Sequence, residues 1–317
     1  MFKNLIQLLD YFKEEKTCYE FLEQQIWNGQ PKCPHCGSER VYKTKTRSKL
    51  PEKQGIPEYK CANNKCYKLF TAISATVFAS SKLPLRTWFG AIFLFTTSKK
   101  GISSLQLARQ LDVTQTSAWH LLHRIREMFK ENAPEILEGT IEADETYVGG
   151  KNKNRHANKQ VEGTQGRSAK DKTPVVGLLE RNGKVITFVV PDTESETIKP
   201  LVIQNVKKGA KLITDAYKSY NGLNDRYKHT KVKHNEGEYK YITVGEFHTN
   251  NIEGFWSLLK RGILGIYHNV SPKHLDKYCT EFGYRYNTRK IEDMERFGAV
   301  VGRVNRKQLT LKSLTTN

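Results

Sequence analysis

Four cysteines in two close pairs constrain the fold of the first third of this chain more than any other feature. They occur as Cys33-Pro-His-Cys36 and Cys61-Ala-Asn-Asn-Lys-Cys66, with twenty-four residues between the pairs. Zinc in structural sites takes four thiolate or imidazole ligands in a tetrahedron, and two short loops of this kind can supply them. The spacing therefore predicts a zinc-ribbon-like domain over residues 31–80, with one structural Zn²⁺ held by Cys33, Cys36, Cys61 and Cys66.

A redox role for the first pair is the alternative interpretation. The tetrapeptide CPHC is similar to the active site of thioredoxin-like oxidoreductases, where it lies between a strand and a helix of a βαβ unit. Here a basic, strand-like stretch follows it, and redox chemistry has no need for a second pair. Zinc is therefore the favoured interpretation.

The two remaining cysteines and the apolar segments indicate the cellular compartment of the protein. Cys18 and Cys279 are isolated, which favours a reducing environment over a disulfide framework. The N-terminus lacks the pattern of a signal peptide, and the longest apolar run, Trp88–Phe95, has eight residues, against about 20 needed to span a bilayer. We expect a cytoplasmic protein without a membrane partner.

Residues 101–129 predict two helices joined by a tight turn. Thr114 is placed to cap the second helix. Apolar residues line one face of each helix, as in a helix-turn-helix; they are Ile102, Leu105, Ala108 and Leu111 in the first and Ala118, Leu121, Leu122 and Ile125 in the second. An ordinary αα-hairpin is the alternative.

The charge balance favours a polyanionic partner. Lys and Arg total 52 against 33 Asp and Glu, a net charge of +19, which points to double-stranded DNA. The second helix would then be a recognition helix, with DNA contacts from Gln115, Thr116, Ser117, Trp119, His120, His123 and Arg124. The segment 149–173 holds seven Lys or Arg and reads as a mobile basic loop, from which we expect Lys151 and Lys153 to contact phosphates, as we expect of Arg261 in a later helix.

Beyond residue 135 the pattern alternates strands and helices. Residues 174–190 carry two β-branched runs around Asn182-Gly183, which predicts a hairpin. Residues 194–206 have helical spacing, KLITD at 211–215 is a short buried strand, and NNIEGFWSLLKRG at 250–262 is an amphipathic helix. The expected order is strand, hairpin, helix, strand, helix.

Three acids stand in this region at positions suited to bind metal. Asp144 lies in the strand 141–148, on the face shared with Glu142 and Thr146; Asp215 ends the strand KLITD; and Glu253 lies early in the last helix. Two Mg²⁺ ions about 3.5 to 4 Å apart need a few convergent carboxylates. Each acid alone is equally typical of a helix cap or a surface group, so it is their order that favours a site.

A cation accompanies the third acid. Lys260 follows Glu253 by seven residues, roughly two helical turns, so both share a face. We expect Lys260 to hold the phosphate backbone.

This order of acids and elements is the RNase H-like arrangement, and the residues resemble a family. The cysteine pairs, GISSLQLARQLDVTQTSAWHLLHRIR, IEADETYVGGK, ITDAYKSY and the stretch HTNNIEGFWSLLKRG through YRYNTR are similar to the ISXO-like insertion-sequence transposases, family fifteen ninety-five. The resemblance covers about residues 15–295.

The resemblance implies a DDE transposase with an RNase H-like catalytic domain and an N-terminal zinc-binding domain. It implies binding to terminal inverted repeats, DNA cleavage and strand transfer with two Mg²⁺ or Mn²⁺ ions, and homo-oligomers that pair two element ends. Asp144 and Asp215 would be the first two ligands, and Glu253 followed by Lys260 fits the third; Asn250 or Asn251 is the alternative third ligand.

The expected organisation is α/β in class. It comprises a helical segment 1–30, the zinc-ribbon-like domain 31–80, a helix-turn-helix region 81–135, the catalytic domain 136–300 and a basic tail 301–317. Two other functions remain open: a domesticated transposase that acts as a DNA-binding regulator, and a nuclease of the same fold that cuts but does not join.

Overall fold

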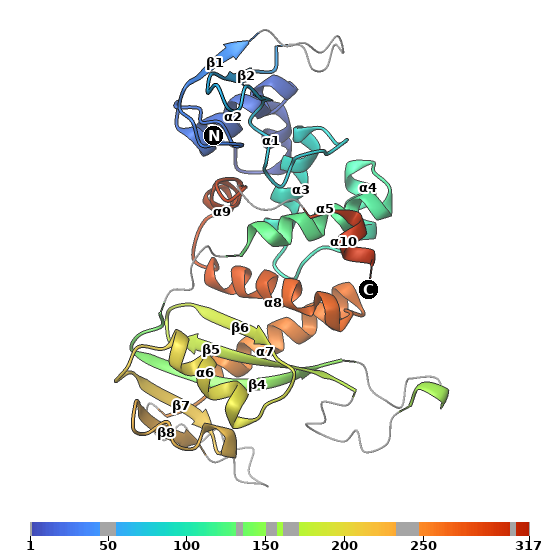
Figure 1. The fold of residues 1–317 in the computed structure, drawn as a ribbon. Helices are drawn as coiled ribbons and strands as arrows, with labels where there is room; N and C mark the ends of the chain where they lie inside the picture. Colours follow the sequence, from blue (N-terminus) through green and yellow to red (C-terminus); the bar gives the residue numbers. More distant parts are fainter. Residues whose placement is uncertain are drawn as a thin grey trace. The chain divides into compact units, whose positions relative to one another are not determined.

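The computed structural model describes residues 2–44, 55–130, 136–149, 157–160, 171–232, 247–304 and 309–316. The chain forms two compact units (Figure 1). The first comprises Met1–Lys130 together with Lys290–Asn317, and the second comprises Glu131–Arg289.

A small antiparallel sheet in the first unit carries the cysteines. Its strands are β1 (Val41–Thr44), β2 (Glu58–Cys61) and β3 (Leu69–Phe70), in that order. Tyr59 and Phe70 stack at 5.7 Å between ring centroids, and Trp27 from helix α2 (Glu15–Trp27) packs edge-on against both. This core is slight, so a bound metal would contribute much of the stability of the sheet.

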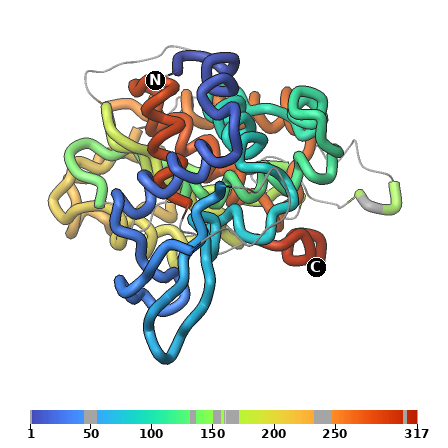
Figure 2. Tube along the Cα trace, turned by 90° about the horizontal axis from the view of Figure 1, so that it is seen from above, coloured from blue at the N-terminus to red at the C-terminus, as the bar shows by residue number. Residues whose placement is uncertain are grey.

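An aromatic cluster joins the N-terminal part of this unit to residues 293–301. Helices α1 (Leu5–Tyr11), α2 and α3 (Leu85–Thr97) pack with α9 (Asp293–Val301), which lies beside the N-terminal segment in Figure 2. The ring of Phe297 is 5.4 Å from that of Phe2 and 5.7 Å from that of Phe89. Residues 293–301 thus belong to the first unit, whereas the sequence had placed residues up to 300 with the catalytic domain.

The two predicted helices and their turn are present as α4 (Ser104–Leu111) and α5 (Gln115–Met128). Asp112 ends α4 with φ 51°, and the Thr114 side chain accepts a hydrogen bond from the Ser117 N–H, as a cap does. Of the predicted core residues, Leu105 is instead half exposed, at 50%. Helix α10 (Leu311–Thr315) follows α9 in the same unit.

The placement of His123 and Arg124 on an outer face of α5 is wrong. His123 is fully buried and its ring lies 4.4 Å from that of Trp119. Arg124 donates hydrogen bonds to the carbonyls of Val77 and Ala79. Every residue from Leu121 to Arg126 is buried, because the C-terminal half of α5 is packed on all sides rather than along one stripe.

The second unit is a mixed sheet with the order β6-β5-β4-β7-β8. Strands β4 (Thr140–Val148), β5 (Thr173–Glu180) and β6 (Val185–Val189) form an antiparallel meander, whereas β7 (Lys211–Asp215) and β8 (Lys228–Val232) run parallel to β4. The predicted hairpin is confirmed, and Asn182 in its turn has φ 63°. The expected elements occur in the expected order, and strand β8, which was not predicted, is added between β7 and α7 (Asn250–Gly262).

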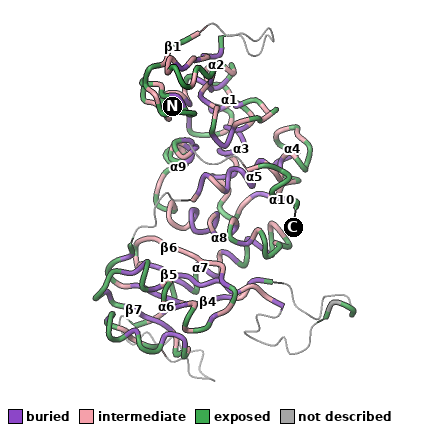
Figure 3. Tube along the Cα trace, in the orientation of Figure 1, coloured by how far each residue is buried: buried purple, intermediate pink, exposed green. Residues whose placement is uncertain are grey.

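Helices cover both faces of this sheet (Figures 1 and 3). Helix α6 (Ser195–Asn205) packs on Ile141, Ala143 and the even-numbered residues of β5, whereas α7 (Asn250–Gly262) and α8 (Pro272–Asn287) pack on the odd-numbered ones. Gly262 lets α7 meet α8, since a Cβ there would overlap the ring of Phe282. Among the described residues, no helix has the length and apolar character that crossing a membrane requires.

The burial of Arg124 generates a stability prediction. Burial lowers the pKa of Arg124 to about 10, and its guanidinium lies 4.9 Å from the Trp88 ring. Arg124→Ala would leave two buried carbonyls without a charged donor, so we expect the free energy of unfolding to fall by about 2 to 3 kcal/mol. Urea denaturation followed by tryptophan fluorescence measures this.

The exposed Arg109 on α4 is the matched control. Arg109→Ala should change stability by no more than about 0.5 kcal/mol. Equal, small effects of both substitutions would contradict the structural role of Arg124.

Candidate active site

Two neighbouring parallel strands bring Asp144 and Asp215 together. In the ladder between β4 and β7, Ala143 pairs with Thr214, so the next residue of each strand is an aspartate. Carboxylate oxygens of Asp144, Glu145 and Asp215 lie within 4.8 Å of one another. Oxygen ligands at this spacing match the preference of Mg²⁺ or Mn²⁺.

Charge crowding at this point shows in the pKa of Asp144. Burial, together with the neighbouring charges of Asp215 and Glu253, raises that pKa to about 6 against the N–H donors that lower it. These carboxylates repel one another in a partly buried position, and a divalent cation bound between them would offset that repulsion. The same effect places the Glu253 carboxylate within electrostatic reach of Asp144.

Helix α7 contacts Asp144 through an indole. The Trp256 Nε1–H donates to Asp144 Oδ2 at 3.0 Å. Gly177 faces Asp144 across the β4–β5 ladder, and a Cβ at Gly177 would stand 2.6 Å from the Trp256 ring. A glycine opposite the aspartate therefore makes room for the tryptophan that orients it. Neither residue carries a charge, so neither was predicted from the sequence.

The N-terminus of α7 is held by Glu142, two residues before Asp144 on the same face of β4. The Glu142 carboxylate is fully buried and accepts hydrogen bonds from the backbone N–H groups of Asn251 and Ile252 and from the Asn251 amide. Arg181 donates to it through Nε at 2.8 Å. Glu142 thus caps the helix from the strand.

Glu253 and Lys260 are both exposed on α7. The Thr249 hydroxyl donates to Glu253 Oε1 at 2.9 Å. Among the described residues, the close carboxylate group consists of Asp144, Glu145 and Asp215, and Glu253 stands outside it. Arg261, also exposed, bonds to Ser257 on its own helix.

Glu145 is the member of this group that was not predicted from the sequence. Strand alternation puts it on the opposite face from Asp144, where the buried Tyr220 hydroxyl donates to its Oε2 at 3.1 Å. Burial raises the pKa of Tyr220, which keeps the phenol a donor. The Glu145 carboxylate nevertheless has an oxygen within 4.8 Å of oxygens of both aspartates.

The two asparagines proposed as alternative ligands differ in their contacts. The Asn251 Nδ2 donates to Glu142 Oε1 at 2.7 Å, so this amide serves the helix cap. Asn250 is exposed, and its backbone N–H donates to His248 Nδ1.

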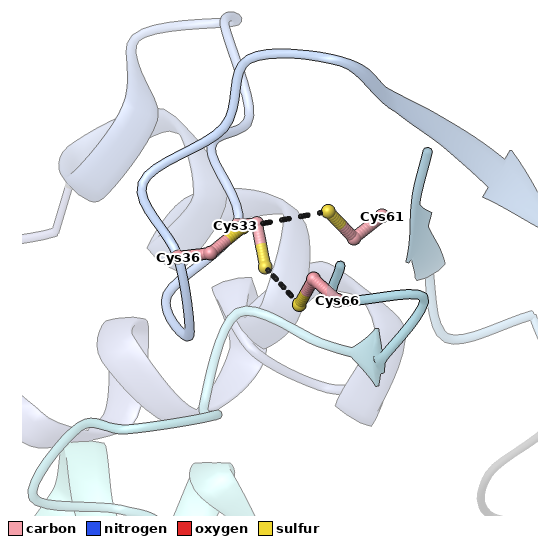
Figure 4. A group of neighbouring side chains, drawn as sticks. All are labelled: Cys33, Cys36, Cys61 and Cys66. Atoms are coloured by element: carbon pink, nitrogen blue, oxygen red, sulfur yellow. Dashed lines mark hydrogen bonds between the residues drawn. The ribbon is translucent and has the colours of Figure 1, made fainter. Parts of the chain in front are cut away.

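The four predicted cysteines form one group (Figure 4). The Sγ atoms of Cys33 and Cys66 are 3.8 Å apart and those of Cys36 and Cys61 are 3.6 Å apart. A tetrahedron with Zn–S bonds of about 2.3 Å has sulfurs about 3.8 Å apart. The geometry therefore fits a zinc ion closed off by four thiolates.

The remaining predicted DNA contacts are divided between surface and interior. Gln115 and Thr116 are exposed at the start of α5, whereas Ser117, Trp119 and His120 are partly buried. His120 Nε2 lies 3.0 Å from the Leu309 carbonyl oxygen. Lys151 and Lys153 lie outside the described residues.

Comparisons with known proteins agree with both sites. Residues 136–287 match the model of the ISXO2-like transposase domain, and residues 13–69 match that of a transposase zinc-ribbon domain. A protein of the transposable element ISH50 from Halobacterium salinarum is 30% identical over 86% of this chain and 91% of its own length. The chain belongs to the ISXO2-like transposase family.

Other comparisons add to this assignment. A transposase-like protein of Haemophilus influenzae is 28% identical over 34% of this chain and 85% of its own length. No solved structure matches the chain significantly. For this family the DDE domain implies an RNase H-like fold, in keeping with the mixed sheet and its two carboxylate-bearing strands.

The cysteine geometry predicts one zinc per chain. Elemental analysis of the purified protein should find equimolar zinc, and Cys61→Ser should abolish it, because three thiolates leave the tetrahedron open. Cys18, which is buried away from the group, supplies the control, since Cys18→Ala should keep the metal. Purified protein without zinc, or free reaction of all four thiols in the folded chain, would rule the site out.

Proposed function

We propose that this chain cleaves the ends of its own insertion sequence and joins them to target DNA. The observation that carries the proposal is the meeting of Asp144 and Asp215 at the end of the β4–β7 ladder, with Glu253 of α7 close enough to raise the pKa of Asp144. In a family of DDE transposases, that placement suits three carboxylates acting on one phosphate.

Asp144, Asp215 and Glu253 would hold two Mg²⁺ or Mn²⁺ ions. The ions would activate water for cleavage and stabilise the leaving 3′-oxygen, and the freed 3′-hydroxyl would attack target DNA in the second step. Trp256 would keep Asp144 Oδ2 engaged, leaving its other oxygen for the metal. Lys260, on the exposed face of α7, would hold the phosphate backbone beside the site.

The terminal inverted repeats would be read by the start of α5. Gln115 and Thr116 are the exposed residues of its first turn and could meet base edges, as a recognition helix does. Arg261, with Lys151 and Lys153 of the basic segment, would supply attraction to phosphates, in line with the net charge of +19. Pairing of two element ends would require a homo-oligomer.

Loss of the third carboxylate tests the catalytic assignment. Glu253→Gln should lower turnover at saturating DNA by at least about a hundredfold in both cleavage and joining, because the lost interaction acts in the transition state. Binding to element ends should stay nearly intact, as for Asp144→Asn and Asp215→Asn. Cleavage and strand transfer on short end duplexes with Mg²⁺ measure this.

Glu138, exposed and paired with Lys207, provides the control: Glu138→Gln should behave as the parent. Normal strand transfer by Glu253→Gln, with activity lost in Asn250→Ala, would move the third ligand to the amide. Cleavage without any joining by the parent would instead identify a nuclease.

The recognition proposal has its own test. Gln115→Ala and Thr116→Ala should each weaken binding to element ends about tenfold while changing binding to unrelated DNA little, because base contacts discriminate and phosphate contacts do not. Lys151→Ala with Lys153→Ala should weaken both and reduce the salt dependence of binding. Titrations at several salt concentrations distinguish the two, and a reversed pattern would exchange the assignments.

A further inference from the structure

Glu142 gathers an unusual number of donors for a residue with no place in the metal chemistry. Its carboxylate is fully buried, and it accepts hydrogen bonds from the Asn251 N–H at 3.0 Å, the Ile252 N–H at 3.0 Å, the Asn251 amide at 2.7 Å and Arg181 Nε at 2.8 Å. His248 Nδ1 lies 3.6 Å from it. A buried carboxylate is costly unless it is paired and bonded in this way.

The same cluster holds the segment that enters α7. Arg181, which follows β5, donates through Nη2 to the His248 carbonyl oxygen at 2.8 Å. Glu142 and Arg181 therefore fix the backbone of residues 248, 251 and 252, on both sides of Thr249. Thr249 is itself buried at 2% exposure, and its hydroxyl donates to the Glu253 carboxylate.

Strand and helix thus meet at two points, one on each side of Glu253. Glu142 binds the first turn of α7, and Trp256, one turn later, donates to Asp144. Residues 142 and 144 are neighbours on one face of β4. Since α7 is tied at residues 251–252 and at 256, the Cα of Glu253 has a set distance from the Asp144 carboxylate.

We infer that Glu142 is a positioning residue for the third carboxylate: through the clamp that it forms with Arg181 and the first turn of α7, it sets where Glu253 stands relative to Asp144. The inference rests on the proposed function, in which Glu253 is a metal ligand. Glu142 itself touches neither metal nor DNA. Its negative charge matters because all of its partners are donors, and one of them is a guanidinium.

Glu142→Gln is the principal variant. A glutamine keeps the shape but offers one acceptor oxygen, and its NH₂ group would face Arg181 or Asn251, donor against donor. We expect faster hydrogen exchange in the peptide covering the start of α7, measured by mass spectrometry without added Mg²⁺ or Mn²⁺. We also expect the Mn²⁺ concentration for half-maximal cleavage, and the Mn²⁺ dissociation constant from calorimetry, to rise about tenfold or more.

Two further variants separate positioning from stability. Glu281 on α8 is another fully buried glutamate with an arginine partner, since Arg285 donates to it at 2.8 Å. Glu281→Gln should lower the melting temperature but leave the Mn²⁺ requirement unchanged. Thr249→Val removes the hydroxyl bonded to Glu253, so it should raise the Mn²⁺ requirement while exchange in α7 stays close to that of the parent.

The outcomes are distinct. Faster exchange in Glu142→Gln with a parental Mn²⁺ affinity would make Glu142 a structural cap and overturn the inference alone. A parent chain that neither binds Mn²⁺ nor cleaves element ends would overturn the proposed function, and the inference with it. If Glu142→Gln does not fold, Asn251→Ala, which removes one bond of the clamp, should show a smaller shift in the same direction.

Discussion

The parallel ladder between β4 and β7 is the constraint on which the rest of the second unit depends. It places Asp144 and Asp215 one step beyond the last residue pair of that ladder, where β7 ends while β4 continues beside β5. Because backbone pairing, and not a side-chain contact, sets this juxtaposition, the two carboxylates stay together despite their repulsion. Because this repulsion is unfavourable, a cation bound between the two carboxylates would stabilise them.

Three further residues near the aspartates determine how helix α7 packs against this edge of the sheet. Gly177 has no side chain and so leaves room for the Trp256 ring, whose N–H donates to Asp144. Glu142 accepts a hydrogen bond from the first turn of α7 and so holds that turn to the same strand. None of these residues would bind metal in the proposed chemistry. These neutral and charged neighbours fix how α7 packs against the sheet beside the two aspartates.

Periodicity and turn chemistry were enough to predict most elements of the second unit. Strand β7 and helix α7 span the residues expected, with Asp215 at the end of the strand and Glu253 in the first turn of the helix. These sequence patterns could not predict tertiary surroundings. Arg124 looks like a DNA contact on a helical wheel, yet α5 is enclosed on all sides near it. Glu145 was not predicted as part of the group, because alternation alone does not show that its carboxylate comes within 4.8 Å of both aspartates. Trp256 gave no signal, because its role arises only from the absence of a side chain at Gly177.

Residues 290–317 belong to the first unit although they follow the second along the chain, which affects the order in which the two units fold during synthesis. The aromatic core around Phe2 and Phe89 includes Phe297, which the ribosome adds only after the entire sheet unit has been synthesised. A nascent chain therefore holds an unfinished N-terminal core while the intervening unit is free to fold first. Translation order thus delays completion of the unit that carries α4 and α5 until residues 136–287 have emerged.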